Sequence, residues 1–169
     1  LDGDVNWATS AGSSSGDSES NGIVVSAGNI FITGFHHNSC KFVSPTTIAG
    51  PYIYGDTAYS NGQSDIFVAK YNYAGVLQTL WTEGGSGNDT GEDIALDVTC
   101  SEVEICGNFS NTMNVSGSEI LIANGQDIFV AAYNLSGTFK WTFQEIGSGD
   151  QEVNSIYARS GRTSFGGGI

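Results

Sequence analysis

The chain has 169 residues, 24 Gly, only 2 Pro, and 18 Asp+Glu against 5 Lys+Arg, which gives a formal net charge of −13. Such a charge repels phosphate backbones and anionic lipid, so it disfavours nucleic acid and membrane surfaces as partners. No apolar run approaches the roughly 18 residues of a membrane span. Short Val-, Ile- and aromatic-rich runs separated by Gly, Ser and Asn, without an apolar helical stripe, predict an all-β fold.

The chain opens with the segment 5–8, which resembles the Trp-bearing end strand of later units, and continues into an acidic Gly/Ser-rich loop at 11–21. Gly28-Asn29 then marks a hairpin turn, because both residues tolerate positive φ. This turn joins predicted strands at 22–26 and 29–34. Further runs of β-prone residues predict strands at 65–71, 76–82, 94–99, 104–109, 127–133, 138–143, 153–158 and 163–168.

One stretch recurs. Asp-Ile-Phe-Val-Ala-Lys-Tyr-Asn at 65–72 returns at 127–134 with only Lys70 replaced by Ala132. Each copy follows Asn-Gly-Gln and precedes a Gly turn and a strand ending in Trp. The chain is therefore a repeat protein, whose units bury their faces against one another. The repeated strand is apolar on both faces, which predicts that it is covered on both sides.

Four short strands per unit predict the four-stranded antiparallel blades of a β-propeller, with about two complete blades and parts of others in this chain. We expect residues 35–64 to form a long insertion between two strands, since the corresponding connection at 110–126 is much shorter. The predicted divisions are the last strand of a preceding blade at 1–10, a blade at 11–82, a second blade at 83–143 and the start of a third at 144–169.

The repeated octapeptide, the Gly turn, Leu-x-x-Leu-Trp, Gly-Gly-Ser-Gly-Asn-Asp and Ile-Ala-Leu-Asp-Val together resemble the bacterial β-propeller repeat (SBBP) family. Gly-Asn-Ile-Phe-Ile-Thr-Gly at 28–34 resembles the family's second strand. The resemblance implies secreted or cell-surface bacterial proteins, commonly without an assigned activity. The chain departs from the pattern at 35–64 and at 99–103, where a Gly-Asn turn would be usual.

A single-chain propeller needs roughly four to eight blades, so two complete blades do not close a ring. Because the chain begins at Leu1 and ends inside what looks like a repeat, we expect it to continue in a longer protein. The alternative is self-assembly, in which the strand at 5–8 completes a blade of a neighbouring copy. The partners implied are other blades of the same or neighbouring chains.

Acidic Gly-rich loops recur at equivalent places and should share one rim of the propeller. Carboxylates with wrapping Gly residues suit Ca²⁺, and the loop at 84–89 matches the opening of a calcium-binding nonapeptide. Plain solvated turns are the favoured interpretation, with Ca²⁺ in at least one loop as the alternative, and no other cofactor is indicated. The candidate ligands are Asp17, Glu19, Asp89, Glu92, Asp93, Asp150 and Glu152.

Further candidates are less specific. Cys100 and Cys106 flank a predicted turn and are candidates for a local disulfide, although their geometry is open. His36-His37 lies near Cys40, but adjacent strand residues point to opposite faces, so a polar loop is favoured over a metal site. Trp7, Trp81 and Trp141 recur and are expected in the core between blades. Sequons occur at Asn88, Asn108, Asn114 and Asn134.

The sequence shows no nucleophilic residue placed beside a general base, so we assign no catalytic residue. The favoured function is a non-catalytic extracellular module, structural or adhesive, within a larger surface protein or filament. One alternative is a carbohydrate- or protein-binding module that uses the loop rim and the insertion at 35–64. Another is an enzyme, a hydrolase or lyase, with carboxylates in a central channel.

Overall fold

The computed structural model describes residues 7–13, 15–26, 28–44 and 55–168, in which eleven β-strands and no helix occur. The all-β prediction is confirmed, and every strand pairing in these residues is antiparallel apart from one isolated bridge. The described residues contain no helix that is long and apolar enough to cross a membrane.

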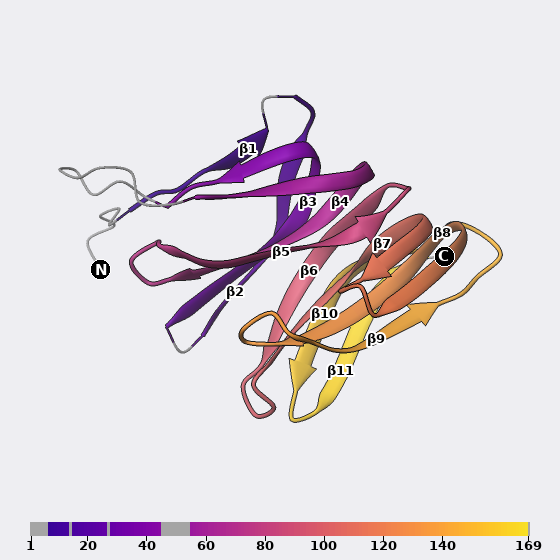
Figure 1. The fold of residues 1–169 in the computed structure, drawn as a ribbon. Coiled ribbons are helices and arrows are strands. Elements are labelled where there is room, and N and C mark those ends of the chain that lie inside the picture. The colour runs from indigo at the N-terminus through magenta and orange to yellow at the C-terminus, as the bar shows by residue number, and fades with distance from the viewer. Residues whose placement is uncertain (1–6, 14, 27, 45–54, 169) are drawn as a thin grey trace.

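The strands form three successive units, which run from the indigo to the yellow end of the chain in Figure 1. A short strand, β1 (Ala11–Ser13), precedes them. Unit 1 is the meander β2 (Ser18–Ser26), β3 (Asn29–Phe42), β4 (Asp56–Asn72) and β5 (Leu77–Gly85). Unit 2 is the meander β6 (Asp89–Asp97), β7 (Glu102–Val115), β8 (Glu119–Asn134) and β9 (Phe139–Glu145). Unit 3 is the hairpin β10 (Glu152–Arg159) and β11 (Arg162–Gly168).

All three units share one local backbone feature. The first strand of each carries a β-bulge, and the second strand places a Gly beside it. A Cβ at Gly34 or Gly107 would lie 1.9 Å from a carbonyl oxygen of the first strand, and one at Gly167 would lie 1.7 Å away. Only Gly allows the two backbones to approach so closely. The shared bulge and Gly identify β10 and β11 as a third copy of the first two strands.

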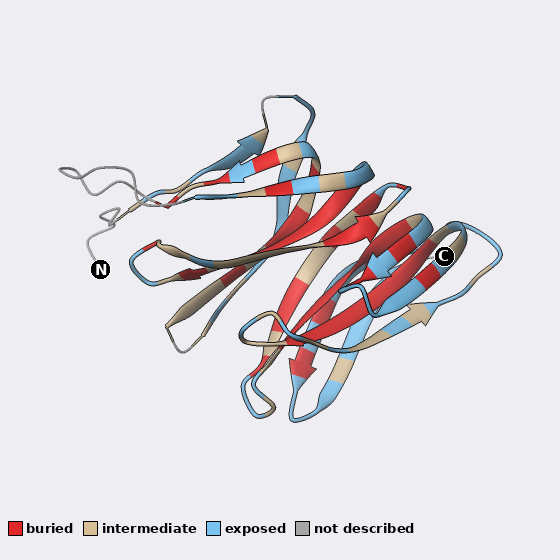
Figure 2. Cartoon of the chain, viewed as in Figure 1, coloured by how far each residue is buried: buried red, intermediate tan, exposed pale blue. Residues whose placement is uncertain are grey.

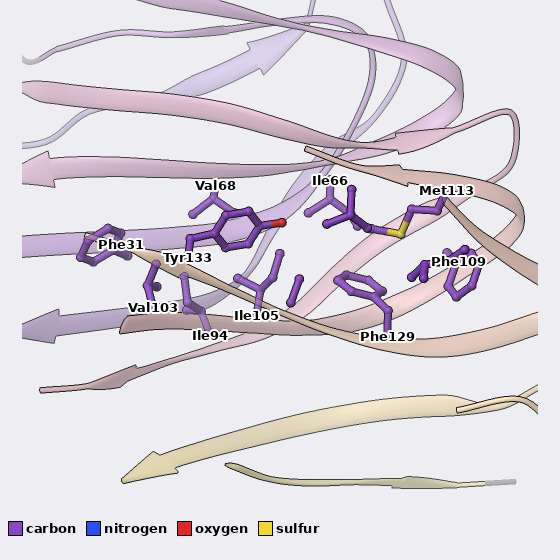
Figure 3. Packing of buried hydrophobic residues seen from close by; sticks show 13 residues of the cluster. Phe31, Ile66, Val68, Ile94, Val103, Ile105, Phe109, Met113, Phe129 and Tyr133 are labelled. Atoms are coloured by element: carbon purple, nitrogen blue, oxygen red, sulfur yellow. The ribbon is translucent and has the colours of Figure 1, made fainter. Parts of the chain in front are cut away.

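The units stack face on face, and apolar side chains fill the space between them. Figure 3 shows Phe31, Ile66 and Val68 of unit 1 against Ile105, Tyr133 and other residues of unit 2. A second cluster lies between unit 2 and β10, so unit 2 is covered on both faces. The fully buried central strands, red in Figure 2, confirm the two-sided burial predicted for the repeated octapeptide.

The predicted insertion at 35–64 is wrong as far as the described residues reach. β3 continues to Phe42 and β4 begins at Asp56, so both arms belong to one long hairpin, and residues 45–54 lie outside the described part. Unit 2 has the same long hairpin in β7 and β8. Each hairpin is interrupted once, at Asn38 (φ 55°) and at Asn111 (φ 61°), because Asn tolerates the left-handed conformation.

The outer part of each hairpin pairs with a strand of the preceding segment. Gly85, at the end of β5, is the partner of Met113 on β7. Ser13 of β1 is the partner of Cys40 on β3, and Cys40 lies two residues after the interruption, as Met113 does. β1 therefore has the position at unit 1 that the end of β5 has at unit 2.

The tryptophans that end the repeated strands are not at equivalent positions. Trp81 is opposite Val68, whereas Trp141 is opposite Ala132, the counterpart of Lys70. The residue opposite Val130, and hence the counterpart of Trp81, is Phe143. The expected location is nevertheless right for both, since each packs against a core cluster between units.

Candidate functional site

The most unusual polar site lies where β5 ends and β6 begins, at the rim between units 1 and 2. It contains two fully buried carboxyl groups, Asp65 and Asp89, each with 0% of its surface exposed. Asp65 begins the repeated octapeptide, and Asp89 ends the loop predicted at 84–89, whose first two residues belong to β5 and whose last belongs to β6. We call the contact between units 1 and 2 the first junction, and that between units 2 and 3 the second junction.

The Asp65 carboxyl has hydrogen-bond partners on one side only. Its Oδ2 accepts from the backbone N–H of Asn61 (2.9 Å), whereas its buried Oδ1 has no hydrogen-bond partner. A Cβ on Gly84 would lie 2.4 Å from the Asp65 Cγ, so Gly84 is the residue that leaves room for this carboxyl. Burial raises the pKa of Asp65 above its ordinary value, because the charged form is poorly solvated.

Asp89 joins three segments at the same rim. Its Oδ2 accepts from the Gly85 N–H (2.7 Å) and its Oδ1 from the Ser110 N–H (3.4 Å). Its own N–H donates to the Ser64 hydroxyl (3.2 Å). Burial, reinforced by the charge of Asp65, raises the pKa of Asp89 to about 7. Two carboxyls placed in this way favour a state in which one of them holds a proton near neutral pH.

The second junction has an amide where the first has a carboxyl. Gln151 lies two residues before the bulge of unit 3, as Asp89 lies two residues before the bulge of unit 2. With its amide oriented so that both neighbours are satisfied, the side-chain nitrogen donates to the Glu145 carbonyl (3.1 Å) and the side-chain oxygen accepts from the Gly147 N–H (3.1 Å). The counterpart of Asp65 is the buried Asp127, whose Oδ2 accepts from the Gln144 amide (2.8 Å).

The predicted calcium ligands do not converge. Among the described residues, no group of three His, Cys, Asp or Glu side chains is placed to hold a metal ion. Several of the candidates instead accept hydrogen bonds from the protein itself. Asp93 accepts from the Ile156 N–H (2.9 Å), Glu92 from the Asn108 amide (3.3 Å) and Asp150 from the Gln126 N–H (3.1 Å). The remaining candidates, Asp17, Glu19 and Glu152, are exposed.

Sequence reasoning missed two acidic residues that matter at the junctions. Asp65 was hidden inside the repeat motif, and its recurrence as Asp127 at the head of an apolar strand was the available signal. Asp97 ties β6 to unit 3, because its Oδ2 accepts from the Gly161 N–H (2.6 Å). That bond, with those from the Thr99 and Cys100 N–H groups, lowers the pKa of Asp97 to about 2.

The four sequons differ in accessibility. Asn88 and Asn114 are exposed, and Asn134 is half-buried at the end of β8. Asn108 is the least accessible of the four, because only 8% of it is exposed and its Oδ1 accepts from the Val153 N–H (3.0 Å) in the second junction.

The predicted disulfide is not formed, since Cys40, Cys100 and Cys106 are all free thiols. Cys100 lies in the turn after Asp97, whereas Cys106 lies four residues into β7 from Glu102. Four extended residues span about 13 Å, well beyond the reach of a disulfide. His36 is buried on β3 with neither ring nitrogen hydrogen-bonded, and burial lowers its pKa.

No protein-family model matches the chain, and no curated protein matches it.

Proposed function

We propose that the three units are blades of a β-propeller that serves as a non-catalytic structural module of an extracellular protein. Each unit begins with the same bulged strand, and each packs its face on the next. Radial stacking of such meanders is how propellers are built. Within the described residues the stack is open, so closure requires further blades from this chain or from neighbouring copies.

One observation carries this proposal: unit 1 exposes apolar side chains on the face that packs against the preceding unit in units 2 and 3. Ile23 and Val25 on β2 are 63% and 53% exposed. The counterpart of Ile23 is Ile94 in unit 2, which is 4% exposed, and Ile156 in unit 3, which is 8% exposed. Both counterparts face the preceding unit. The open face of unit 1 therefore fits a further blade.

The position of β1 agrees with such a blade. β1 pairs with the outer part of β3 as the last strand of unit 1 pairs with β7. It would then be the last strand of a blade that stacks on the open face. That face has a small cavity of about 100 Å³ beside Phe67, Ala69 and Tyr71, into which side chains of the additional blade would fit.

A structural role is favoured over the alternatives by how the rim carboxylates are used. Asp89, Asp93 and Asp97 accept backbone N–H bonds across or beside the junctions. Such bonds fix one unit on the next and leave these carboxylates partnered. The binding alternative relied on a long loop at 35–64, and the described part of that segment is hairpin. An extracellular, adhesive or filament-forming setting follows from the resemblance to the SBBP repeats and is part of the proposal.

The test is a comparison of side-chain accessibility in the native protein, whatever its full length. Hydroxyl-radical footprinting should find Ile23 and Val25 protected, because an adjoining blade covers them. Ile120 and Ile122, which are 70% and 67% exposed, are the matched controls and should react freely. Electron microscopy of the same material should show rings with radial blades. Equal reactivity of the two pairs, with particles that are not ring-shaped, would overturn the proposal.

A further inference from the structure

Two exposed Asn-Gly pairs lie in loops that interrupt the long hairpins. Residues 60–63 of β4 and 123–125 of β8 have no partner on the neighbouring second strand, so each loop leaves the ladder just before the repeated octapeptide. The pairs are Asn61-Gly62 and Asn124-Gly125, and all four residues are exposed. In such a pair the Gly nitrogen can attack the Asn side-chain carbonyl, since Gly has no Cβ to hinder the approach. Both loops therefore carry the same reactive dipeptide.

In unit 1 the carboxyl of Asp65 lies against the reacting groups of this dipeptide. Its Oδ2 accepts from the Asn61 backbone N–H (2.9 Å), and the Asn61 side-chain Nδ2 lies 3.4 Å from the same oxygen. Burial raises the pKa of Asp65, and the Asn61 N–H, the Asn61 amide and the Gly62 N–H oppose that rise as donors to the carboxyl. One carboxyl therefore faces both the backbone nitrogen that attacks in such a reaction and the amide nitrogen that leaves.

The corresponding loop of unit 2 has a different donor at its carboxyl. Asn61 precedes Asp65 by four positions. Asn124 precedes Asp127 by three, so its loop is one residue shorter. The Asp127 Oδ2 accepts from the Gln144 amide (2.8 Å), and its buried Oδ1 has no hydrogen-bond partner. The Gln144 amide, and not the Asn-Gly pair, is thus the donor to this carboxyl.

We propose that Asn61-Gly62 is a self-modifying site, at which Asp65 promotes closure of a cyclic imide and release of ammonia. Asp65 accepts the proton of the Gly62 N–H as that nitrogen bonds to the Asn61 Cγ. The bond from Cγ to Nδ2 breaks, and the same proton passes to Nδ2, which leaves as ammonia. Water then opens the imide to an aspartyl or isoaspartyl residue at position 61. The reaction needs water as its only co-reactant, and nothing is oxidised or reduced.

The packing around the loop fixes the Gly of this pair and places its base. A Cβ at Gly62 would lie 2.2 Å from the Gly85 carbonyl oxygen, so only Gly fits where β4 meets the end of β5. Asp65 is wholly buried whereas Asn61 is exposed, so the carboxyl faces a dipeptide that water reaches. A poorly solvated carboxylate is a stronger base than a solvated one. The product adds a carboxylate beside the acid pair of the first junction, Asp65 and Asp89.

A third Asn-Gly pair, Asn21-Gly22, completes the comparison. Gly22 is buried, and the Asn21 amide donates to the Gly91 carbonyl of unit 2 (3.0 Å). That bond holds the amide nitrogen across the first junction, so we expect this pair to react no faster than Asn124.

The experiment incubates the native protein, whatever its full length, at neutral pH. Peptide mapping by mass spectrometry then measures how fast each Asn-Gly pair is converted to aspartyl and isoaspartyl forms. We expect Asn61 to react at least about tenfold faster than Asn124, since acid–base catalysis contributes about a hundredfold or more in favourable cases. In urea the fold is lost, and the two pairs should react at similar rates. Equal rates in the native protein, faster reaction at Asn124, or a ratio that urea leaves unchanged would each overturn the inference.

Asp65→Asn tests the role of the carboxyl directly. It keeps the size of the side chain and removes the base, so Asn61 should slow to about the rate of Asn124. Asp127→Asn is the matched control at the head of the second octapeptide and should leave the rate at Asn61 unchanged. An unchanged rate at Asn61 in folded Asp65→Asn protein would overturn the inference.

The rate at Asn124 also reports whether a variant is folded, because unfolding should bring it to the rate seen in urea. The comparison of native and urea-treated protein uses the unaltered chain, so misfolding of a variant cannot mask the result. The chemistry at Asn61 is independent of how many blades close the ring. Failure of this test therefore leaves the proposed function standing, and failure of the footprinting test leaves the self-modifying site standing.

Discussion

The two junctions between units have the same backbone but different chemistry at one rim position. In the first junction, Asp89 lies near Asp65, and both carboxyls are buried. In the second, Gln151 replaces Asp89, and its amide hydrogen-bonds to backbone groups as a neutral side chain. The bulge and the Gly opposite it are alike in both. The fold therefore needs a hydrogen-bonding side chain at this position, and the charge is a separate property of the first junction.

The largest effect is expected when the second junction is given the charge of the first. Gln151→Glu keeps the size of the side chain but replaces its donor to the Glu145 carbonyl with a buried carboxylate. An unpaired buried charge is costly, so the free energy of unfolding at pH 8 should fall by about 3 to 5 kcal/mol. Urea denaturation at pH 8 and pH 5 measures it. The loss should be smaller at pH 5, and an equal loss at both would contradict the charge as its cause.

The unaltered protein should lose stability as the pH rises toward neutrality. The folded pKa of Asp89, about 7, lies above its ordinary value of 3.8, so the folded state binds the proton more tightly than the unfolded state. The stability from this proton is complete below about pH 4 and is lost as the pH rises through 7. Because proton binding by Asp89 is coupled to folding, we expect the free energy of unfolding to fall by about 2 to 4 kcal/mol over this pH range. Denaturation midpoints between pH 4 and 8 measure it, and a flat profile would contradict the proton-holding pair.

Asp89→Asn makes the first junction resemble the second. Removing the charge relieves its repulsion with Asp65. The amide oxygen keeps the short bond from the Gly85 N–H, and only the longer 3.4 Å bond from the Ser110 N–H is lost, because an amide nitrogen cannot accept it. We expect the free energy of unfolding at pH 8 to rise by about 1 to 2 kcal/mol, with a flatter profile below pH 7. Asp127→Asn is the matched control. It alters the acceptor of the Gln144 amide and should give no such gain.

The sequence was sufficient for the parts of the fold that a local pattern determines. The repeated octapeptide, apolar on both faces, located the buried central strands, and the Gly turns located the hairpins. The outer arms of the long hairpins were missed, because exposed positions such as Tyr59 and Ile120 carry apolar residues, so the sequence there does not alternate between apolar and polar residues. Aligning the units on Trp81 and Trp141 also misled, whereas Glu83 and Glu145 are in matching register.

The acid pair could not be read from the sequence for a different reason. Asp65 and Asp89 belong to different units and meet only because β5 returns the chain to the rim at Gly84 and Gly85. Each carboxylate alone looks like an ordinary turn residue. Burial, and hence the raised pKa values, depends on how unit 2 packs on unit 1, which no local pattern specifies.

The smallest effect is expected at the opposite rim, where the pKa of the buried carboxyl group is lowered rather than raised. Asp97 accepts the Gly161 N–H and has a pKa lowered to about 2, so its stabilising effect is present above its ordinary value of 3.8 and is lost as the pH falls through 2. Asp97→Asn should lower the melting temperature at pH 7 by a few degrees and leave it unchanged at pH 2. Because Asp89 loses its stabilising effect as the pH rises and Asp97 as it falls, Asp89→Asn combined with Asp97→Asn should flatten the profile on both sides. Retention of either slope in the double variant would assign that slope to other groups.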